Sequence, residues 1–382
     1  MEKRNWLNTG RETYTARERE LIGVDHAVRA RSFFRGHPAY GRTPLHPLPA
    51  LAGTAGVASI RIKDESGRMG LGSFKALGGM YAVARLVRTE AEAEAGTGTE
   101  GGHGPGPAEA RLREVAARTP FVCASAGNHG LSVTAAVRGL GGRPIVFLSE
   151  DVPEQFAHRL RSLGAEVRRG GSDYEESMAT ALEAAGRHGW RLVSDSSWDG
   201  YTTVPLDIMR GYTVLFDEIG GLGETAEPSE ADEAGEAPTH VFVQAGVGGL
   251  AAAAAGYVRD RWGEGPRVVV VEPQAAPCLL ASARAGRPTR VDGGRTRLGR
   301  LDCREPSLLA WRLLSRLADA FVTVTDGQAE AAARLLAAEG VRVSACGAAG
   351  AAGLLSLDQD TRAALELGPG SSVLVVGTEG AL

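Results

Sequence analysis

Short apolar runs and amphipathic segments alternate along most of this chain. Apolar runs that end at turn residues predict buried strands, at 121–124, 144–148, 166–168, 192–193, 241–244, 267–272 and 373–376. Segments with apolar residues at helical spacing lie between them and predict helices, at 130–137, 153–163, 173–186, 249–258, 308–317 and 328–338. This β-α rhythm predicts parallel sheets covered by helices, which is an α/β fold.

Two segments interrupt the rhythm, one at 89–110 and one at 220–239. The first combines alternating alanine and glutamate with glycine and proline, and the second is acidic and contains prolines. Neither composition can bury much apolar surface, so both are expected to be flexible surface insertions. The first should be removable without loss of the fold.

Length, composition and charge indicate a globular protein rather than a membrane protein or a nucleic-acid-binding protein. The chain has 382 residues, of which 43% are apolar and 23% charged, so an ordinary globular protein of two domains is expected. A net charge of −4 gives no sign of a nucleic-acid-binding surface. No apolar run is long enough to span a bilayer, and the N-terminus lacks the apolar segment of a secretory signal. We therefore expect a cytoplasmic protein without membrane or nucleic-acid partners.

The four cysteines are widely spaced, at Cys123, Cys278, Cys303 and Cys346. This spacing does not suit a zinc site, so no metal is expected. Buried thiols in a reducing compartment are the simplest interpretation. A loop could bring Cys278 and Cys303 together, but the sequence does not show whether it does.

Lys75 is the most informative candidate residue. A lysine near a helix start is usually a solvated surface residue, and helix N-termini disfavour cations. The neighbours of Lys75, however, are Phe74, Ala76 and Leu77. Desolvation on an apolar stretch favours the neutral amine, and only the neutral amine can form a Schiff base with an aldehyde.

A glycine-rich loop at 244–250 directly follows a predicted strand. Alone it is equally consistent with a tight β-α turn and with a phosphate site made of backbone N–H groups. It satisfies neither the dinucleotide fingerprint nor the nucleotide P-loop pattern. A nicotinamide-dependent dehydrogenase is therefore excluded.

The turn Ser125-Ala126-Gly127-Asn128-His129-Gly130 is more specific. Its structural interpretation is a strand-to-helix turn capped by Asn128 or Ser125. Its functional interpretation is that Asn128 donates to a phenolic oxygen of a cofactor while backbone N–H groups bind a substrate carboxylate; His129 is expected to be structural rather than a base. An imine-forming lysine, this turn and an anion loop together indicate pyridoxal phosphate.

Ligand sites lie at the carboxyl ends of parallel strands, so 125–130, 245–250, Glu272 and 377–380 could converge.

These loops, in this order, resemble the fold-type II pyridoxal-phosphate enzymes of the tryptophan synthase β and threonine dehydratase superfamily. The resemblance covers nearly the whole chain and is closest to the diaminopropionate ammonia-lyases. It is carried by the segments 63–81, 198–201, 244–248, 271–273, 303–306 with Trp311, and 377–380. Trp198-Asp199-Gly200-Tyr201 and Glu305-Pro306 with Trp311 distinguish this group from ordinary serine or threonine dehydratases.

The resemblance implies a fold and a set of roles. It implies two three-layer α/β domains with mostly parallel sheets and pyridoxal phosphate in the cleft between them, in a homodimer. The large domain would comprise 1–78 and 209–382, and a small mobile domain 79–208. Lys75 would hold the cofactor and move the α-proton, with Asp195 near the substrate. The remaining implied positions are the phosphate-binding residues Gly246, Val247, Gly248 and Gly249, Asn128 at the phenolic oxygen, Thr378 at the pyridine nitrogen, and Ser125, Ala126, Gly127 and His129 at the substrate.

Two departures from the ammonia-lyase pattern leave the substrate open. Ala126 stands where these enzymes have an aspartate, and Cys346 lies in a stretch where they have a glutamate. The expected activity is β-elimination from a small β-substituted amino acid, giving a 2-oxo acid and ammonia. A serine or threonine dehydratase, a β-replacement synthase and a non-catalytic binding relative are the alternatives. With Lys75 as the obvious base on one face, the L-isomer is the expected substrate.

Overall fold

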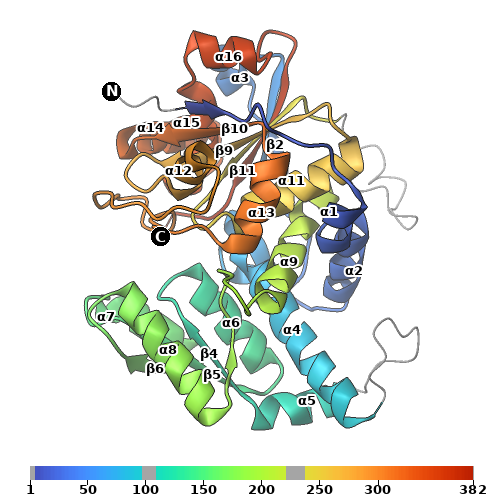
Figure 1. Cartoon of the computed structure of the whole chain (residues 1–382), viewed down its shortest axis with the longest axis vertical. Helices are drawn as coiled ribbons and strands as arrows, with labels where there is room; N and C mark the ends of the chain where they lie inside the picture. Colours follow the sequence, from blue (N-terminus) through green and yellow to red (C-terminus); the bar gives the residue numbers. More distant parts are fainter. Residues whose placement is uncertain (1–4, 97–108, 221–236, 382) are drawn as a thin grey trace. The chain divides into compact units, whose positions relative to one another are not determined.

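The computed structural model describes residues 5–96, 109–220 and 237–381. The chain divides into two compact units (Figure 1). The large unit comprises Met1–Phe74, Ser196–Thr202 and Tyr212–Leu382, and the small unit comprises Lys75–Asp195 and Thr203–Gly211. Each unit combines helices with a sheet whose central strands are parallel, which confirms the predicted fold class.

A seven-stranded sheet forms the centre of the large unit. Its order is β1-β10-β9-β8-β11-β3-β2, with the two edge strands β1 and β2 antiparallel and all other neighbours parallel. The strands are β1 (Asn5–Leu7), β2 (Leu45–Pro47), β3 (Ser59–Asp64), β8 (His240–Gln244), β9 (Arg267–Pro273), β10 (Ala320–Val324) and β11 (Ser372–Gly377). The carboxyl ends of β3, β8, β9 and β11 therefore meet at one edge of the sheet.

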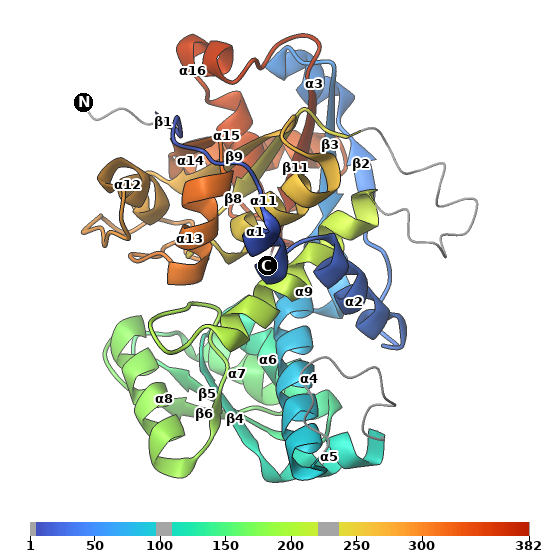
Figure 2. The ribbon, with the colours of Figure 1, turned by 45° about the vertical axis from the view of Figure 1, so that its right-hand side comes forward.

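Helices cover both faces of this sheet, as Figures 1 and 2 show from two directions. Val268, Val269, Val270 and Val271 of β9 are all fully buried, although successive side chains of a strand point to opposite faces. Val269 and Val271 belong to a core shared with α3, α14 and α15, and α11 packs on β8 and β9. The helices are α1 (Ala16–Leu21), α2 (Val24–Arg35), α3 (Pro49–Ala55), α11 (Gly249–Trp262), α12 (Cys278–Ala285), α13 (Leu308–Leu317), α14 (Asp326–Ala338), α15 (Ala349–Leu355) and α16 (Gln359–Ala364).

The small unit has a four-stranded parallel sheet in the order β6-β5-β4-β7. Its strands are β4 (Pro120–Ala124), β5 (Arg143–Leu148), β6 (Glu166–Arg169) and β7 (Arg191–Leu192). Its helices are α4 (Lys75–Glu94), α5 (Glu109–Arg118), α6 (Asn128–Gly139), α7 (Glu154–Ser162), α8 (Tyr174–His188) and the first half of α9 (Thr203–Gly220). A Cβ on Gly79 of α4 would lie 2.2 Å from Ser132 Oγ of α6, so the two helices approach closely because Gly79 has no side chain.

The predicted strands and helices are all present, with ends shifted by a few residues, but one expectation was wrong. Residues 89–94 do not form a flexible insertion; they continue α4, where Ala91 is fully buried. Glu94 forms ion pairs with Arg111 and Arg118 of α5. Alanine and glutamate are strong helix formers, so their alternation extends the helix. Residues 97–108, and 221–236 of the second segment, lie outside the described residues.

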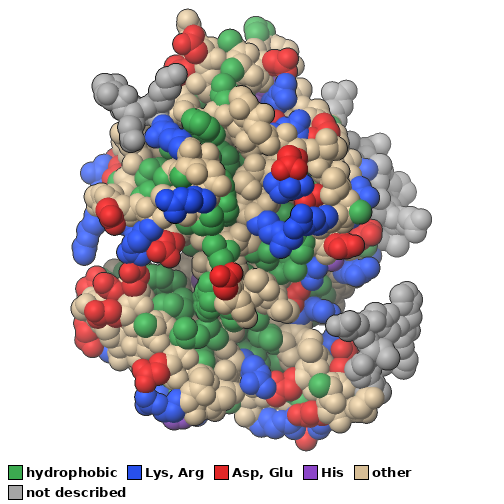
Figure 3. All heavy atoms as spheres, in the orientation of Figure 1, with side chains coloured by type: hydrophobic (Ala, Val, Ile, Leu, Met, Phe, Trp, Pro, Cys, Tyr) green, Lys and Arg blue, Asp and Glu red, His purple; other side chains and the backbone are tan. Residues whose placement is uncertain are grey.

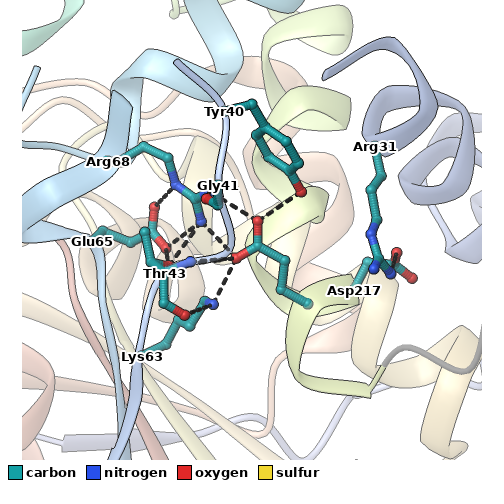
Figure 4. A network of polar contacts seen from close by, with 9 residues as sticks. Arg31, Tyr40, Gly41, Thr43, Lys63, Glu65, Arg68 and Asp217 are labelled. Carbon is teal, nitrogen blue, oxygen red and sulfur yellow. Dashed lines mark hydrogen bonds and ion pairs between the residues drawn. The ribbon is translucent and has the colours of Figure 1, made fainter. Parts of the chain in front are cut away.

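A buried cluster of charges joins β3, the 3₁₀ helix η1 (Glu65–Gly70) and the end of α9 within the large unit. Arg68 Nε is 2.7 Å from Glu65 Oε2, Arg68 Nη2 is 2.8 Å from Glu218 Oε2, and Lys63 Nζ is 2.6 Å from the same Glu218 oxygen. The four side chains are at most 1% exposed, and Figure 4 shows Lys63, Glu65 and Arg68 converging beside Thr43. Burial raises the pKa of Glu218, but the charges of Lys63 and Arg68 outweigh burial and hold it well below its usual range. Two positive and two negative charges thus balance one another.

The surface view in Figure 3 shows basic and acidic side chains both spread over the face drawn. Among the described helices, none combines the length and the hydropathy that crossing a membrane requires.

Candidate active site

The residues immediately before Lys75 form backbone hydrogen bonds with the segment 378–380 of the large unit. The Phe74 N–H donates to the Thr378 carbonyl at 3.1 Å, and the Gly380 N–H donates to the Gly72 carbonyl at 3.1 Å. Ser73 and Glu379 form the antiparallel bridge between these two bonds. The residues just before Lys75 are therefore paired with the segment that follows β11.

Lys75 is the first residue of α4, as the sequence predicts, and it forms an ion pair with Asp195. Burial raises the pKa of the Asp195 carboxyl, but the Lys75 ammonium outweighs burial and holds it far below its usual range. The apolar neighbours of Lys75 in the sequence are therefore accompanied by a carboxylate, which can hold a proton beside the amine.

Lys63, the other lysine that the structure describes, does not offer a comparable amine. Lys3 lies outside the described residues, and Lys63 is fully buried. Lys63 Nζ donates to the Thr43 carbonyl at 2.6 Å and pairs with Glu218. Of the lysines that the structure describes, Lys75 alone is both accessible and next to a proton acceptor.

Replacing Asp195 with asparagine is expected to destabilise the cofactor-free protein by about 2 kcal/mol at pH 7, because a charged hydrogen-bonded pair is lost. The folded-state pKa of Asp195 lies below its unfolded value near about 4. Its contribution is thus fully present above the unfolded pKa, begins to fall below about pH 4 and is lost only as the pH passes through the much lower folded pKa. The difference in melting temperature between the two proteins should therefore be constant from pH 7 to about pH 5 and become smaller toward pH 3. A difference that stayed constant down to about pH 3 would contradict the assignment.

The turn after β4 is fixed by local contacts. Ser125 Oγ accepts the Gly127 N–H at 3.3 Å, and a Cβ on Gly130 would lie 2.1 Å from the Ser125 carbonyl oxygen. The expected cap is wrong in detail, because α6 begins at Asn128 and Gly127 is its N-cap residue without a side-chain bond. The residues from Ser125 to Asn128, including Ala126, are all partly exposed.

His129 is buried at the start of α6. Its Nε2 lies 2.8 Å from the Val193 carbonyl, and burial lowers the pKa of its ring. Its Nδ1 has no hydrogen-bond partner among the described residues. A neutral His129 therefore ties α6 to the strand end two residues before Asp195, which agrees with the structural role expected for it.

The glycine-rich loop joins β8 to α11 in the large unit. Within the described residues, the backbone N–H groups of Gly246, Val247, Gly248 and Gly249 donate no hydrogen bond, while the Val247 carbonyl accepts one. A Cβ on Gly246 would lie 2.8 Å from Cys303 Sγ, and Gly248 has φ of 101°. Only glycine suits both positions. Unsatisfied N–H groups beside a helix N-terminus fit the phosphate of pyridoxal phosphate.

Gln244 begins the glycine-rich loop, and sequence reasoning gave it no role of its own. Its Nε2 lies within 2.8–3.1 Å of the carbonyls of Cys346, Gly347 and Val376 and 3.1 Å from Thr378 Oγ1, so its two N–H groups are shared among these four acceptors. Because its oxygen accepts the Gln244 N–H, the Thr378 hydroxyl can direct its own proton elsewhere. The signal in the sequence was a polar residue directly after the apolar run Val241-Phe242-Val243. Gln244, at the end of β8, thus lies in contact with Thr378, just after β11.

The edge beside the loop also contains Glu272 and two thiols. Glu272 accepts the N–H groups of Leu279 and Leu280 at 2.7 Å each, and burial raises its pKa to about 8. Cys278 Sγ lies 3.7 Å from the Gly246 carbonyl, so both Cys278 and Cys303 lie against Gly246. All four cysteines are free thiols, as expected. No group of three His, Cys, Asp or Glu side chains in the described ranges could hold a metal ion.

Comparison with known proteins gives consistent matches over nearly the whole chain. The family described as pyridoxal-phosphate dependent enzyme matches residues 37–379. The diaminopropionate ammonia-lyase of Escherichia coli K12 is 32% identical over 373 residues, which cover 94% of this chain and 89% of that protein. That of Salmonella typhimurium LT2 is 32% identical over 401 residues, covering 98% and 94%. The crystal structure of the E. coli enzyme in complex with D-serine has a TM-score of 0.84 and 30% identity, covering 98% of this chain and 93% of that chain.

Proposed function

This chain belongs to the family of pyridoxal-phosphate-dependent enzymes, and from that premise we propose that it is a β-eliminating ammonia-lyase. It would convert a small amino acid with a leaving group on Cβ into a 2-oxo acid and ammonia. The observation that carries this proposal is the Lys75–Asp195 pair at the start of α4. A protein that only bound the cofactor would need an amine but no adjacent proton acceptor.

The residues proposed to hold the cofactor each match one of its functional groups. Lys75 Nζ would attach it covalently, and the free N–H groups of Gly246 to Gly249 would bind its phosphate. Asn128 would donate to the phenolic oxygen. Thr378, bonded by Gln244, would offer a hydroxyl to the pyridine nitrogen, which does not force that nitrogen to be protonated. When bound, pyridoxal phosphate supplies the electron sink that accepts the electron pair released at Cα.

The proton transfers fall to Lys75 and Asp195. As a neutral amine, Lys75 Nζ would take the proton from the substrate Cα. Asp195 then stabilises the resulting ammonium, and Lys75 can return a proton to the group that leaves from Cβ. The N–H groups of the turn at Ser125, Ala126 and Gly127 are proposed to bind the substrate carboxylate, with His129 supporting the turn.

The substrate is proposed from the names of the relatives and from Ala126, which departs from the ammonia-lyase pattern. Diaminopropionate is the substrate that their name gives, and a solved relative binds D-serine. Ala126 provides no carboxylate in the turn, which favours serine or threonine as an alternative substrate, because a second amino group would lack a partner there. A base on the opposite face would also be missing, so the L-isomer is preferred.

The test is an assay of 2-oxo acid and ammonia with L- and D-isomers of diaminopropionate, serine and threonine. The unaltered protein is expected to turn over an L-isomer at least about tenfold faster than its D-isomer. Ala126→Asp should raise turnover of D-isomers or of diaminopropionate, whereas Ala126→Asn should not. Equal rates on D- and L-diaminopropionate in the unaltered protein would contradict the importance of Ala126. Release of a new amino acid instead of ammonia when a thiol is added would identify a β-replacement synthase.

A further inference from the structure

The N-terminus of α13 is capped by a segment more than a hundred residues away in sequence. Ser307 precedes the helix but makes no side-chain cap bond of its own. Instead, the Leu309 N–H donates to Ser197 Oγ at 2.8 Å, and the Leu308 N–H donates to the Ser197 carbonyl at 3.1 Å. The first N–H groups of a helix have no partner inside it, so Ser197 satisfies two of them.

Ser197 and Ser307 are also bonded to each other. Their Oγ atoms are 2.7 Å apart, and the Ser197 N–H donates to Ser307 Oγ at 3.0 Å. Ser197 is 3% exposed and Ser307 1% exposed, so water cannot replace these bonds. Both residues belong to the large unit. They adjoin the Trp198–Tyr201 and Glu305–Pro306 segments, which the catalytic roles leave unexplained.

The Ser197 segment is itself rigid. Trp198 and Tyr201 bond through their backbones in both directions, at 3.3 and 2.9 Å, and Gly200 between them has φ of 83°. Their rings stack with centroids 4.4 Å apart. This tight hairpin fixes the position from which Ser197 reaches α13.

The capped N-terminus of α13 is also hydrogen-bonded to the glycine-rich loop. The Ser307 N–H donates to the Val247 carbonyl at 3.0 Å. A trans peptide is planar, with its C=O and N–H on opposite sides. Because the Ser307 N–H holds the Val247 carbonyl toward α13, the Gly248 N–H of the same peptide points away from α13. This N–H can then donate to a ligand.

We infer that Ser197 and Ser307 are positioning residues for the phosphate-binding loop. Their hydroxyl pair fixes the start of α13, whose Ser307 N–H orients the Val247–Gly248 peptide. The inference rests on the proposed function, because it assigns the loop to the cofactor phosphate. The affinity of the protein for the cofactor phosphate then depends on two buried serines that contact neither the cofactor nor the substrate.

The test compares two probes, pyridoxal phosphate and pyridoxal, in titrations of cofactor-free protein. Ser197→Ala and Ser307→Ala should each weaken binding of pyridoxal phosphate about five- to tenfold, the effect of losing one buried hydrogen bond. Binding of pyridoxal, which lacks the phosphate, should change less than about twofold. The double variant should lose much less than the product of the single losses, because both hydroxyls act through one contact. Ser307→Thr keeps the hydroxyl and should restore affinity.

Ser315→Ala is the matched control, since Ser315 lies on the same helix and its hydroxyl contacts only the Arg312 carbonyl among the described residues. It should leave both affinities unchanged. Equal weakening of both probes by Ser197→Ala, or no weakening of either, would overturn the inference while leaving the proposed function intact. If the unaltered protein bound pyridoxal phosphate no more tightly than pyridoxal, the proposed function itself would fail.

Discussion

Replacing Lys75 with alanine is expected to abolish covalent attachment of pyridoxal phosphate and to lower ammonia release at least about 10³-fold. Two functions are lost together, because Lys75 Nζ both holds the cofactor and is the base proposed for the Cα proton. The absorbance of the covalently bound cofactor should disappear. Steady-state rates and the visible spectrum of the purified variant measure both effects.

Peptide mapping after borohydride reduction gives the sharper result. The sequence contains three lysines, Lys3, Lys63 and Lys75, so each can be assigned separately. In the native protein the label should be on Lys75, whereas unfolded protein treated identically should be labelled at all three. A native label on Lys3 or Lys63 would refute the site assignment.

Replacing Arg68 with alanine is expected to lower the free energy of unfolding by about 3–5 kcal/mol, because it leaves the buried Glu65 carboxylate without its ion-pair partner and Glu218 with Lys63 alone. Arg68 bonds both Glu65 and Glu218, and none of the three side chains is more than 1% exposed. Urea unfolding of the cofactor-free protein, followed by circular dichroism, measures the change.

Two further variants separate charge from packing. Arg68→Met with Glu65→Gln removes one charge of each sign, so it should be less destabilising than Arg68→Ala alone. Arg187→Ala breaks the exposed pair with Glu183, whose side chains are 66% and 67% exposed, and should have little effect. An Arg68→Ala protein as stable as the Arg187→Ala protein would show that the buried cluster contributes nothing.

Strands and loops whose conformation depends on residues adjacent in the sequence could be predicted from the sequence. Val241 to Gln244 and Val373 to Val376 are apolar runs between turn residues, and both are strands. The glycines at 246 and 248 indicated an unusual backbone loop, and they lie where a side chain would collide or strain the chain. The short edge strands β1 and β2, with three residues each, are too brief to give a periodic signal and were missed.

By itself, the sequence determined the α/β fold, the lysine at a helix start and the glycine-rich loop after a strand. Tertiary structure alone decided which distant residues meet: Lys75 with Asp195 at a separation of 120 residues, Gln244 with Thr378 at 134, and Ser197 with Ser307 at 110. The order of strands in the sheet places β8 beside β11 rather than beside the strand that precedes it in the chain. That order is set by the packing of whole helices and strands around a shared core. Local patterns fix the conformation of each loop, but not which loops become neighbours.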